Sequence, residues 1–448
     1  MSVEHSPGHG IPYYLVCYDA SGRERPAKDG LASDGLLTAA TAERPSDVFI
    51  FSHGWNADPG GAVQTYGRWV DVMAASASNR ARLDAGAGGF RPLLVGLHWP
   101  SKAWADENLA GMSYSAGDDS EVSSTDRVTD SVEQLVTWYA DNLGGGPGAE
   151  AAIRNIVESA FRDAAPPTLP DDVREAYARL DAGIGLKQAG EGAAPGDDRD
   201  RFDPEETYQA ALLMDVVSPV SFGGFSLGGV LAPLRVLSFW AMKRRARVFG
   251  EAGAAELLRR LQDAVPDGRF HLMGHSFGCI VASAAIAGGV GGPALRRSVD
   301  SLVLAQGAMS LWSFCESIPA HPGLAGYFHG IVGKRLVRGP MLATTSVHDR
   351  AVGLFYPLGA GARGQFAFEN GNLPVYGGIG SFGVRGPGIE IRDEDVERVD
   401  DSYQMRQGVC YNLKADAVIA TSAGISGAHS DICHPEVARA VWRAVDCR

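Results

Sequence analysis

Short apolar runs that predict β-strands alternate with longer helical patterns over much of this 448-residue chain. A helix that links two strands returns the chain to the same edge of the sheet, so the strands run parallel. The alternation therefore predicts an α/β fold, with a mostly parallel central sheet flanked by helices on both faces. The predicted strands cover residues 47–52, 91–98, 269–273, 299–305, 340–345 and 415–420. The predicted helices cover residues 61–75, 236–264, 277–287 and 435–445.

One acidic block interrupts this pattern. Residues 101–210 hold 23 acidic and 9 basic residues, whereas the rest of the chain holds 30 and 31. The block is rich in Ala, Gly and Pro and contains only short helical patterns, at 129–143 and 171–180. We therefore predict an inserted, mainly helical and irregular cap subdomain with mobile loops, in which the acidic stretch 197–206 is a solvated loop. The predicted organisation is a core of residues 1–100, 236–310 and 340–448, the cap at 101–235 and a minor cap segment at 311–339.

Composition excludes some classes of protein and favours one compartment. The net charge of −13 argues against a chain whose whole surface binds nucleic acid or an anionic membrane. Six cysteines without a Cys-x-x-Cys spacing favour reduced thiols and no zinc site. The polar N-terminus lacks the basic and apolar segments of a secretory signal. We expect a cytoplasmic protein without a bound metal.

Residues 216–234 form an uncharged stretch of nearly membrane-spanning length. Pro219, Pro233 and four glycines within it argue against a continuous helix. We expect it to pack on the core or to roof an apolar pocket for an acyl chain. A basic cluster follows at 243–247, which we expect on the exposed side of a helix. Contact of this region with a membrane surface is the less favoured alternative.

The motif Gly-His-Ser-Phe-Gly at 274–278 lies between the predicted strand 269–273 and the helix that follows it. Glycines two residues before and after Ser276 allow strand and helix to approach closely through a strained turn. Such a turn lifts the serine hydroxyl clear of the sheet edge and points the N-terminus of the helix at it. Ser276 is therefore the candidate nucleophile.

A second pentapeptide of the same form lies at 224–228 and contains Ser226. The residues before it include Pro219 and make a poor strand, and a long helical pattern follows it. Because Ser226 lacks the strand–turn–helix context, we favour Ser276.

A serine nucleophile needs a base and an acid that orients the base. Asp349 follows the predicted strand 340–345, and His429 lies between the last predicted strand and the last helix. Both positions are loops at strand ends, which favours the roles of orienting acid and general base. Asp349 as a helix N-cap, and His348 or His434 as the base, are the alternatives; His434 precedes Pro435 at a helix start, which favours a structural role.

The motif His-Gly-Trp-Asn at 53–56 follows the strand 47–52. An early strand that ends in His-Gly supplies a backbone N–H for a tetrahedral oxyanion, and the residue after the nucleophile supplies a second. We predict that Trp55 and Phe277 provide these two donors. His53 is equally compatible with a loop histidine that holds the turn by hydrogen bonds. The residues expected to line the site are His53, Gly54 and His275.

These motifs resemble those of the serine hydrolases of the α/β-hydrolase superfamily. The resemblance rests on the segments at 53–56 and 274–278, the strand-end Asp349, and Gly-Ala-His-Ser-Asp at 427–431. It covers about residues 45–100, 236–310 and 339–445 and leaves the acidic block outside. It implies an eight-stranded, mostly parallel sheet, a Ser276–His429–Asp349 triad and no cofactor. The large insertion precedes the nucleophile turn, between the fourth and fifth core strands, whereas the commonest plan of the superfamily places the cap after the sixth.

The activity implied by this resemblance is hydrolysis of a carboxylic ester, with a small-molecule ester or acyl compound as substrate and a hydrophobic acyl group as one option. The superfamily also contains thioesterases, amidases, peptidases, acyltransferases and proteins without activity. Acyl transfer, cleavage of a thioester or amide, and an inactive binding or scaffold protein therefore stay open as alternatives. The oligomeric state is also open.

Overall fold

The computed structural model describes residues 3–27, 30–55, 57–84, 89–102, 124–186, 191–217, 229–289, 291–356, 373–421 and 426–447. Its centre is a nine-stranded sheet in the order β1-β2-β4-β3-β5-β6-β7-β9-β8. Only the β1–β2 pair is antiparallel among the pairs described. The strands are β1 (Val3–His5), β2 (Pro12–Cys17), β3 (Asp47–Ser52), β4 (Pro92–His98), β5 (Arg269–His275), β6 (Ser301–Ala305), β7 (Met341–Thr345), β8 (Ile391–Asp395) and β9 (Cys410–Lys414).

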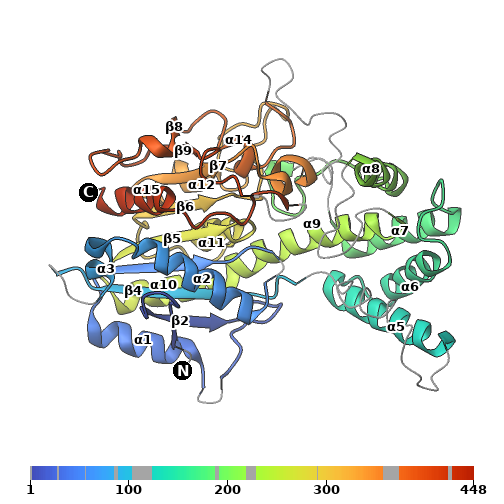
Figure 1. Ribbon diagram of the computed structural model, residues 1–448, viewed down its shortest axis with the longest axis horizontal. Coiled ribbons are helices and arrows are strands. Elements are labelled where there is room, and N and C mark those ends of the chain that lie inside the picture. The colour runs from blue at the N-terminus through green and yellow to red at the C-terminus, as the bar shows by residue number, and fades with distance from the viewer. Residues whose placement is uncertain are drawn as a thin grey trace.

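Helices cover both faces of the sheet, as the alternation predicts (Figure 1). Along β3, Val48 and Ile50 enter one core cluster whereas Phe49 and Phe51 enter the other, because successive side chains point to opposite faces. One face is covered by α1 (Ala32–Glu43), α10 (Ala255–Ala264), α11 (Gly278–Ala287) and part of α9 (Ala232–Phe249). The other is covered by α2 (Pro59–Met73), α3 (Ala77–Leu83) and α15 (Pro435–Asp446). The α/β class with a mostly parallel sheet is thus confirmed.

The prediction of a strand at 415–420 is wrong. Strand β9 ends at Lys414, opposite Thr345 of β7. The chain then turns, and the N–H groups of Val418 and Ile419 both donate to the carbonyl of Ala415. Ala415 and Ile419 are buried below this turn, which is why the segment looks apolar in sequence. Strands β1, β2, β8 and β9 were not predicted, and the sheet has nine strands where the resemblance implies eight.

The described part of the insertion is mainly helical and has its own core. It comprises α5 (Ser124–Leu143), α6 (Pro147–Arg162), α7 (Asp171–Ile184), the short η3 (Glu191–Ala193) and α8 (Pro204–Val217). Buried apolar residues of α5, α6 and α7 form one cluster with the first half of α9. The expectation of only short helical patterns is therefore wrong: apolar residues spaced by three and four positions give α6 and its neighbours buried faces. Figure 1 shows these helices to one side of the sheet.

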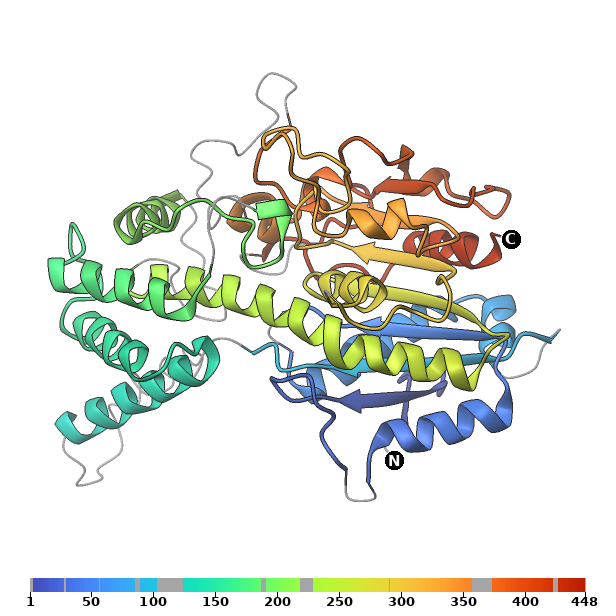
Figure 2. The ribbon, with the colours of Figure 1, turned by 180° about the vertical axis from the view of Figure 1, so that it is seen from behind.

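Helix α9 connects the insertion to the sheet (Figure 2). Its residues Leu234, Leu237 and Trp240 pack in the insertion core, and Met242 and Phe249 pack in the core below the sheet. The predicted boundary at 235/236 thus falls inside one helix. A π-helical turn, η4 (Gly250–Ala254), links α9 to α10 within the predicted helix 236–264.

The acidic stretch 197–206 and the basic cluster 243–247 each contain buried charged residues. Asp198 and Arg199 are buried, and so is Lys243, so the expectations of a solvated loop and of an exposed basic helix face are wrong at these residues. Arg244 donates to the carbonyls of Ile184 and Gly185 at the end of α7. Arg245 likewise donates to the carbonyl of Asn142 at the end of α5. Cations are favourable at helix C-termini, so α9 uses this cluster to hold the insertion helices.

No described helix combines the length and the apolar character needed to cross a membrane. Most of the uncharged stretch, residues 218–228, lies outside the described part of the chain, and with it Ser226. Short helical segments complete the fold at α12 (His329–Gly333), η5 (Ala351–Phe355), α14 (Ile379–Phe382) and η7 (Val396–Arg398).

Candidate active site

Ser276 occupies a strained turn between β5 and α11. Its φ of 56° lies in the left-handed region, which non-glycine residues seldom adopt. A Cβ on Gly274 would lie 2.2 Å from the carbonyl carbon of Gly278. A Cβ on Gly278 would lie 2.1 Å from the carbonyl oxygen of Ser52. Both flanking glycines are therefore required by backbone contacts, in the way that the motif predicts.

The structure brings Ser276, His429 and Asp349 into one hydrogen-bonded chain. The Ser276 Oγ lies 2.8 Å from His429 Nε2, and His429 Nδ1 lies 2.8 Å from Asp349 Oδ2. The three residues follow the carboxyl ends of β5, β7 and β9, which meet at one edge of the sheet. Side chains that are separated by up to 153 positions in sequence thus become neighbours.

The alternative bases lie elsewhere. His348 is exposed, and its carbonyl accepts a hydrogen bond from the Ala428 N–H, which fixes the loop that carries His429. His434 is the residue before α15, and its Nε2 lies 2.9 Å from Asp431 Oδ1. The N-cap alternative for Asp349 coexists with its contact to His429, because its Oδ1 accepts from the Val352 N–H while Oδ2 faces the histidine.

Gln306 is a residue of this site that the sequence reasoning missed. It is fully buried, follows β6 and has a φ of 47°. Its side-chain amide donates to Asp349 Oδ2 over 3.0 Å, and its amide oxygen accepts from the Thr344 hydroxyl. Gln306 therefore donates to the same carboxylate oxygen that faces His429, and it fixes that oxygen from a second direction. No motif contains it; only its position directly after a predicted strand signalled it.

The predicted oxyanion donors lie beside Ser276. A Cβ on Gly54 would lie 2.6 Å from the Ser276 Cβ, so only glycine allows this loop to reach the nucleophile. Phe277 precedes the first residue of α11, where backbone N–H groups lack intrahelical partners. The rings of Trp55 and Phe277 contact each other, with centroids 5.9 Å apart. Asn56 lies outside the described residues.

His53 and His275 support the site without joining the hydrogen-bonded chain. His53 Nδ1 donates to the Gly54 carbonyl, and its Nε2 accepts from the Trp99 N–H, so the ring holds the turn as a neutral side chain. His275 Nε2 donates to the carbonyl of His429 over 2.9 Å. Burial lowers the pKa of His53 to about 3 and is also the main cause that lowers the pKa of His275 to about 3.

We expect the protein to lose stability on acidification because of His53. The unfolded chain binds a proton at this residue below about pH 6.5, whereas the folded chain does so only near pH 3. Between these values the unfolded state holds more protons than the folded state. The free energy of unfolding therefore decreases as the pH is lowered, by roughly 2 kcal/mol from pH 6.5 to pH 5. Urea titrations at several pH values measure this slope. His53→Gln should reduce it and His5→Gln, at an exposed position, should not; an equal slope in His53→Gln contradicts the assignment.

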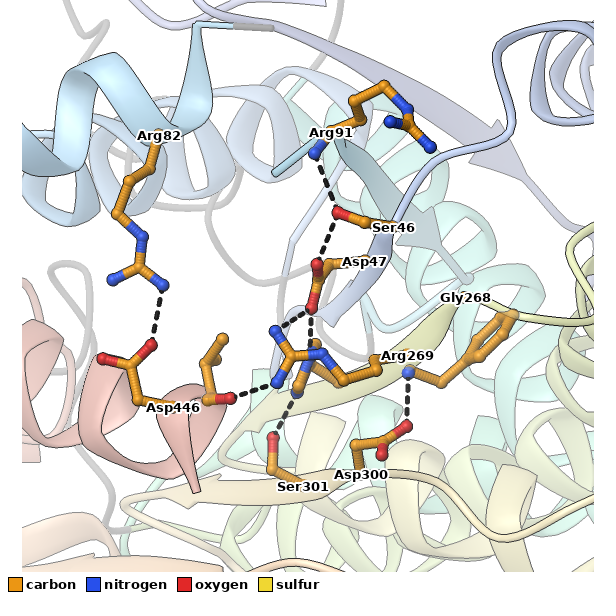
Figure 3. Close-up of polar contacts among 12 residues, drawn as sticks. Ser46, Asp47, Arg82, Arg91, Gly268, Arg269, Asp300, Ser301 and Asp446 are labelled. Carbon is orange, nitrogen blue, oxygen red and sulfur yellow. Dashed lines mark hydrogen bonds and ion pairs between the residues drawn. The ribbon is translucent and has the colours of Figure 1, made fainter. Parts of the chain in front are cut away.

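A second Ser–His–Asp set lies at the amino ends of the strands, opposite the carboxyl ends that carry Ser276, and Figure 3 shows two of its members, Asp47 and Ser301. His271 contacts Ser301 Oγ through Nδ1 at 2.9 Å and Asp47 Oδ1 through Nε2 at 3.1 Å. Ser301 is fully buried, and the cavity lined by Asp47 and Arg269 is lined by neither Ser301 nor His271. This set lacks access and a strained turn, and it is a structural network at the amino ends of the strands.

The cysteines and the other side chains that commonly bind metals are dispersed in the described part of the chain. All six cysteines are free thiols, and the described residues contain no group of three or more His, Cys, Asp or Glu side chains that could hold a metal ion.

No family model, no curated protein and no solved structure matches this chain.

Proposed function

We propose that this chain is a serine hydrolase with an α/β-hydrolase fold that cleaves carboxylic esters. The observation that carries the proposal is the hydrogen-bonded chain Ser276–His429–Asp349, built on a serine with a φ of 56° between a strand and a helix. Each of the three residues follows a different strand at one sheet edge, in the order Ser, Asp, His along the chain. The nine-stranded sheet with an insertion between β4 and β5 is compatible with this fold.

In the proposed reaction, the Ser276 Oγ attacks the ester carbonyl carbon while His429 Nε2 takes the hydroxyl proton. Asp349 accepts from His429 Nδ1–H, holds that tautomer and stabilises the imidazolium that forms. The N–H groups of Trp55 and Phe277 donate to the oxyanion of the tetrahedral intermediate. His429 then protonates the leaving alcohol, and an acyl-Ser276 ester remains. Water, deprotonated by His429, attacks this ester; the bond from the acyl carbon to Oγ then breaks, His429 returns the proton to the Ser276 Oγ, and the carboxylic acid leaves.

The first test is labelling of the full chain with a fluorophosphonate, followed by peptide mass mapping. A phosphonate bond forms at a serine only where its proton is removed and the fluoride leaves, so an adduct reports an activated nucleophile. We expect one adduct, on the peptide with Ser276, and none in Ser276→Ala. Ser301→Ala is the matched control from the inaccessible set and should be labelled like wild type. An adduct on Ser226, or no adduct in the folded protein, contradicts the assignment.

A further inference from the structure

Three buried polar side chains from distant parts of the chain meet beside the candidate site. Lys243 of α9, Asp198 of the insertion and Tyr356 after η5 are each at most 2% exposed. The Lys243 ammonium donates to the Asp198 carboxylate and, over 2.6 Å, to the Tyr356 hydroxyl. The Tyr356 hydroxyl donates in turn to Asp198 Oδ2. We call these three residues the lysine cluster.

The charge of Lys243 is held by rings as well as by the carboxylate. Its Nζ lies 4.4 Å from the ring centroid of Trp240 and 4.0 Å from that of Tyr356, within the range of cation–π attraction. Oδ1 of Asp198 has no hydrogen-bond partner among the described residues, so this carboxylate depends on Lys243 and Tyr356. A buried charge without its partner is strongly unfavourable. The cluster therefore fixes the relative positions of its three segments.

One connection from the lysine cluster leads to the acid of the site. Tyr356 directly follows η5, and this short helix begins two residues after Asp349. Asp349 caps it, since its Oδ1 accepts from the Val352 N–H over 3.0 Å. The segment from Asp349 to Tyr356 is thus held at one end by His429 and Gln306, and at the other end by Lys243 and Asp198.

A second connection leads to the nucleophile side of the site through aromatic rings. The ring of Tyr356 contacts that of Phe239, with centroids 6.3 Å apart. Phe239 contacts Phe277 at 4.9 Å and Trp55 at 5.5 Å, the two residues whose N–H groups are the proposed oxyanion donors. Phe239 and Trp55 are only partly buried, so each ring keeps some solvent-accessible apolar surface.

We propose that Lys243 is a positioning residue that sets the acyl-group selectivity of this site, by holding Tyr356 and Trp240 so that Phe239 forms a fixed apolar wall beside Ser276. The inference rests on the proposed function. The substrates that depend on the wall are esters whose acyl chain is long enough to contact Phe239. A short acyl group reaches Ser276 without using it. Through Asp198, the lysine cluster also connects the insertion to the site, although no residue of the insertion belongs to the triad.

The test compares esters of increasing acyl length, from p-nitrophenyl acetate to the decanoate, in the full chain. Lys243→Met alone leaves the Asp198 carboxylate buried without its cation, so the main variant is the uncharged pair Lys243→Met/Asp198→Asn. Arg245→Met is the matched control. Arg245 lies on the same helix and holds the insertion through Asn142, and its hydrogen bonds do not involve the apolar wall formed by Phe239. Tyr356→Phe keeps the ring and removes both hydrogen bonds, and Tyr177→Phe, which removes a buried hydroxyl of the insertion core, is its control.

We expect the double variant to lower kcat/KM for decanoate by about tenfold or more, since small displacements beside reacting groups are costly. Acetate hydrolysis should change less than about threefold by the same reasoning, because the short acyl group does not use the wall. Tyr356→Phe should shift the decanoate-to-acetate ratio in the same direction, and it decides the matter if the double variant does not fold. Arg245→Met and Tyr177→Phe should keep the wild-type ratio.

An unchanged ratio in the folded double variant, or an equal shift in Arg245→Met, overturns the role of Lys243. In either case wild type would still hydrolyse esters and carry the fluorophosphonate adduct on Ser276, so only the positioning role would fail. If wild type is neither labelled nor active, the proposed function fails and this inference fails with it.

Discussion

Ser276→Ala is expected to abolish ester hydrolysis while the protein stays folded. Removal of a serine nucleophile lowers kcat by about 10⁴- to 10⁶-fold, because the covalent route is lost and only the oxyanion donors and substrate binding continue to act. Alanine is smaller than serine and makes no new contact with Gly54, which already lies against the Cβ. Initial rates with a p-nitrophenyl ester and the thermal unfolding midpoint measure the two effects.

Ser301→Ala is the control for this prediction. It removes the hydroxyl that His271 contacts, at a fully buried position on the opposite edge of the sheet. The expected loss is about 1 kcal/mol of stability, the usual value for one hydrogen bond, with the hydrolysis rate unchanged. General-base activation of a nucleophile alone contributes about 10²-fold or more to the rate. A Ser276→Ala variant that keeps more than about one per cent of the wild-type rate would therefore show that Ser276 is not the nucleophile.

Asp349→Asn is expected to lower kcat by about 10⁴-fold, with little change in substrate binding. An asparagine side chain can donate to His429 Nδ1, which favours the tautomer with the proton on Nε2. That nitrogen then cannot accept from the Ser276 hydroxyl, although the atoms stay within 2.8 Å of one another. Steady-state kinetics separates kcat from KM, and the rate of fluorophosphonate labelling should fall in parallel with kcat.

Two further variants calibrate this result. Gln306→Met removes the donor to Asp349 Oδ2 at similar side-chain length. We expect a loss of roughly tenfold in kcat, since a hydrogen bond to a charged group contributes about 1.5 to 3 kcal/mol. Asp416→Asn is the control for charge removal near this loop, because Asp416 accepts from the Val347 N–H and does not contact His429. An equal loss in Asp416→Asn and Asp349→Asn would contradict the special role of Asp349.

Local sequence determined the strand–turn–helix around Ser276. The two glycines, the apolar strand before them and the small-residue helix after them lie within about twenty consecutive residues, so their geometry follows from neighbouring backbone contacts. The same reasoning placed Asp349 on a loop at the end of β7, because parallel strands bring such loops to one edge. It placed His429 after a strand at 415–420 that is a turn in the structure, and the strand before His429 is β9, which ends at Lys414. Sequence reasoning could not determine the distances of Asp349 and His429 from each other and from Ser276.

Tertiary structure alone decided the residues that act through distant partners. Asp198 and Lys243 lie in charged segments that predict solvent exposure, and they are buried because each offsets the desolvation of the other across 45 positions. Gln306 lies in no motif, since its role depends on Asp349, 43 positions further along the chain. The segment 415–420 was mistaken for a strand because the apolar pattern there arises from burial below a turn. Periodicity and turn chemistry report interactions over a few residues, whereas burial of a charge is stable only where the whole fold supplies the partner.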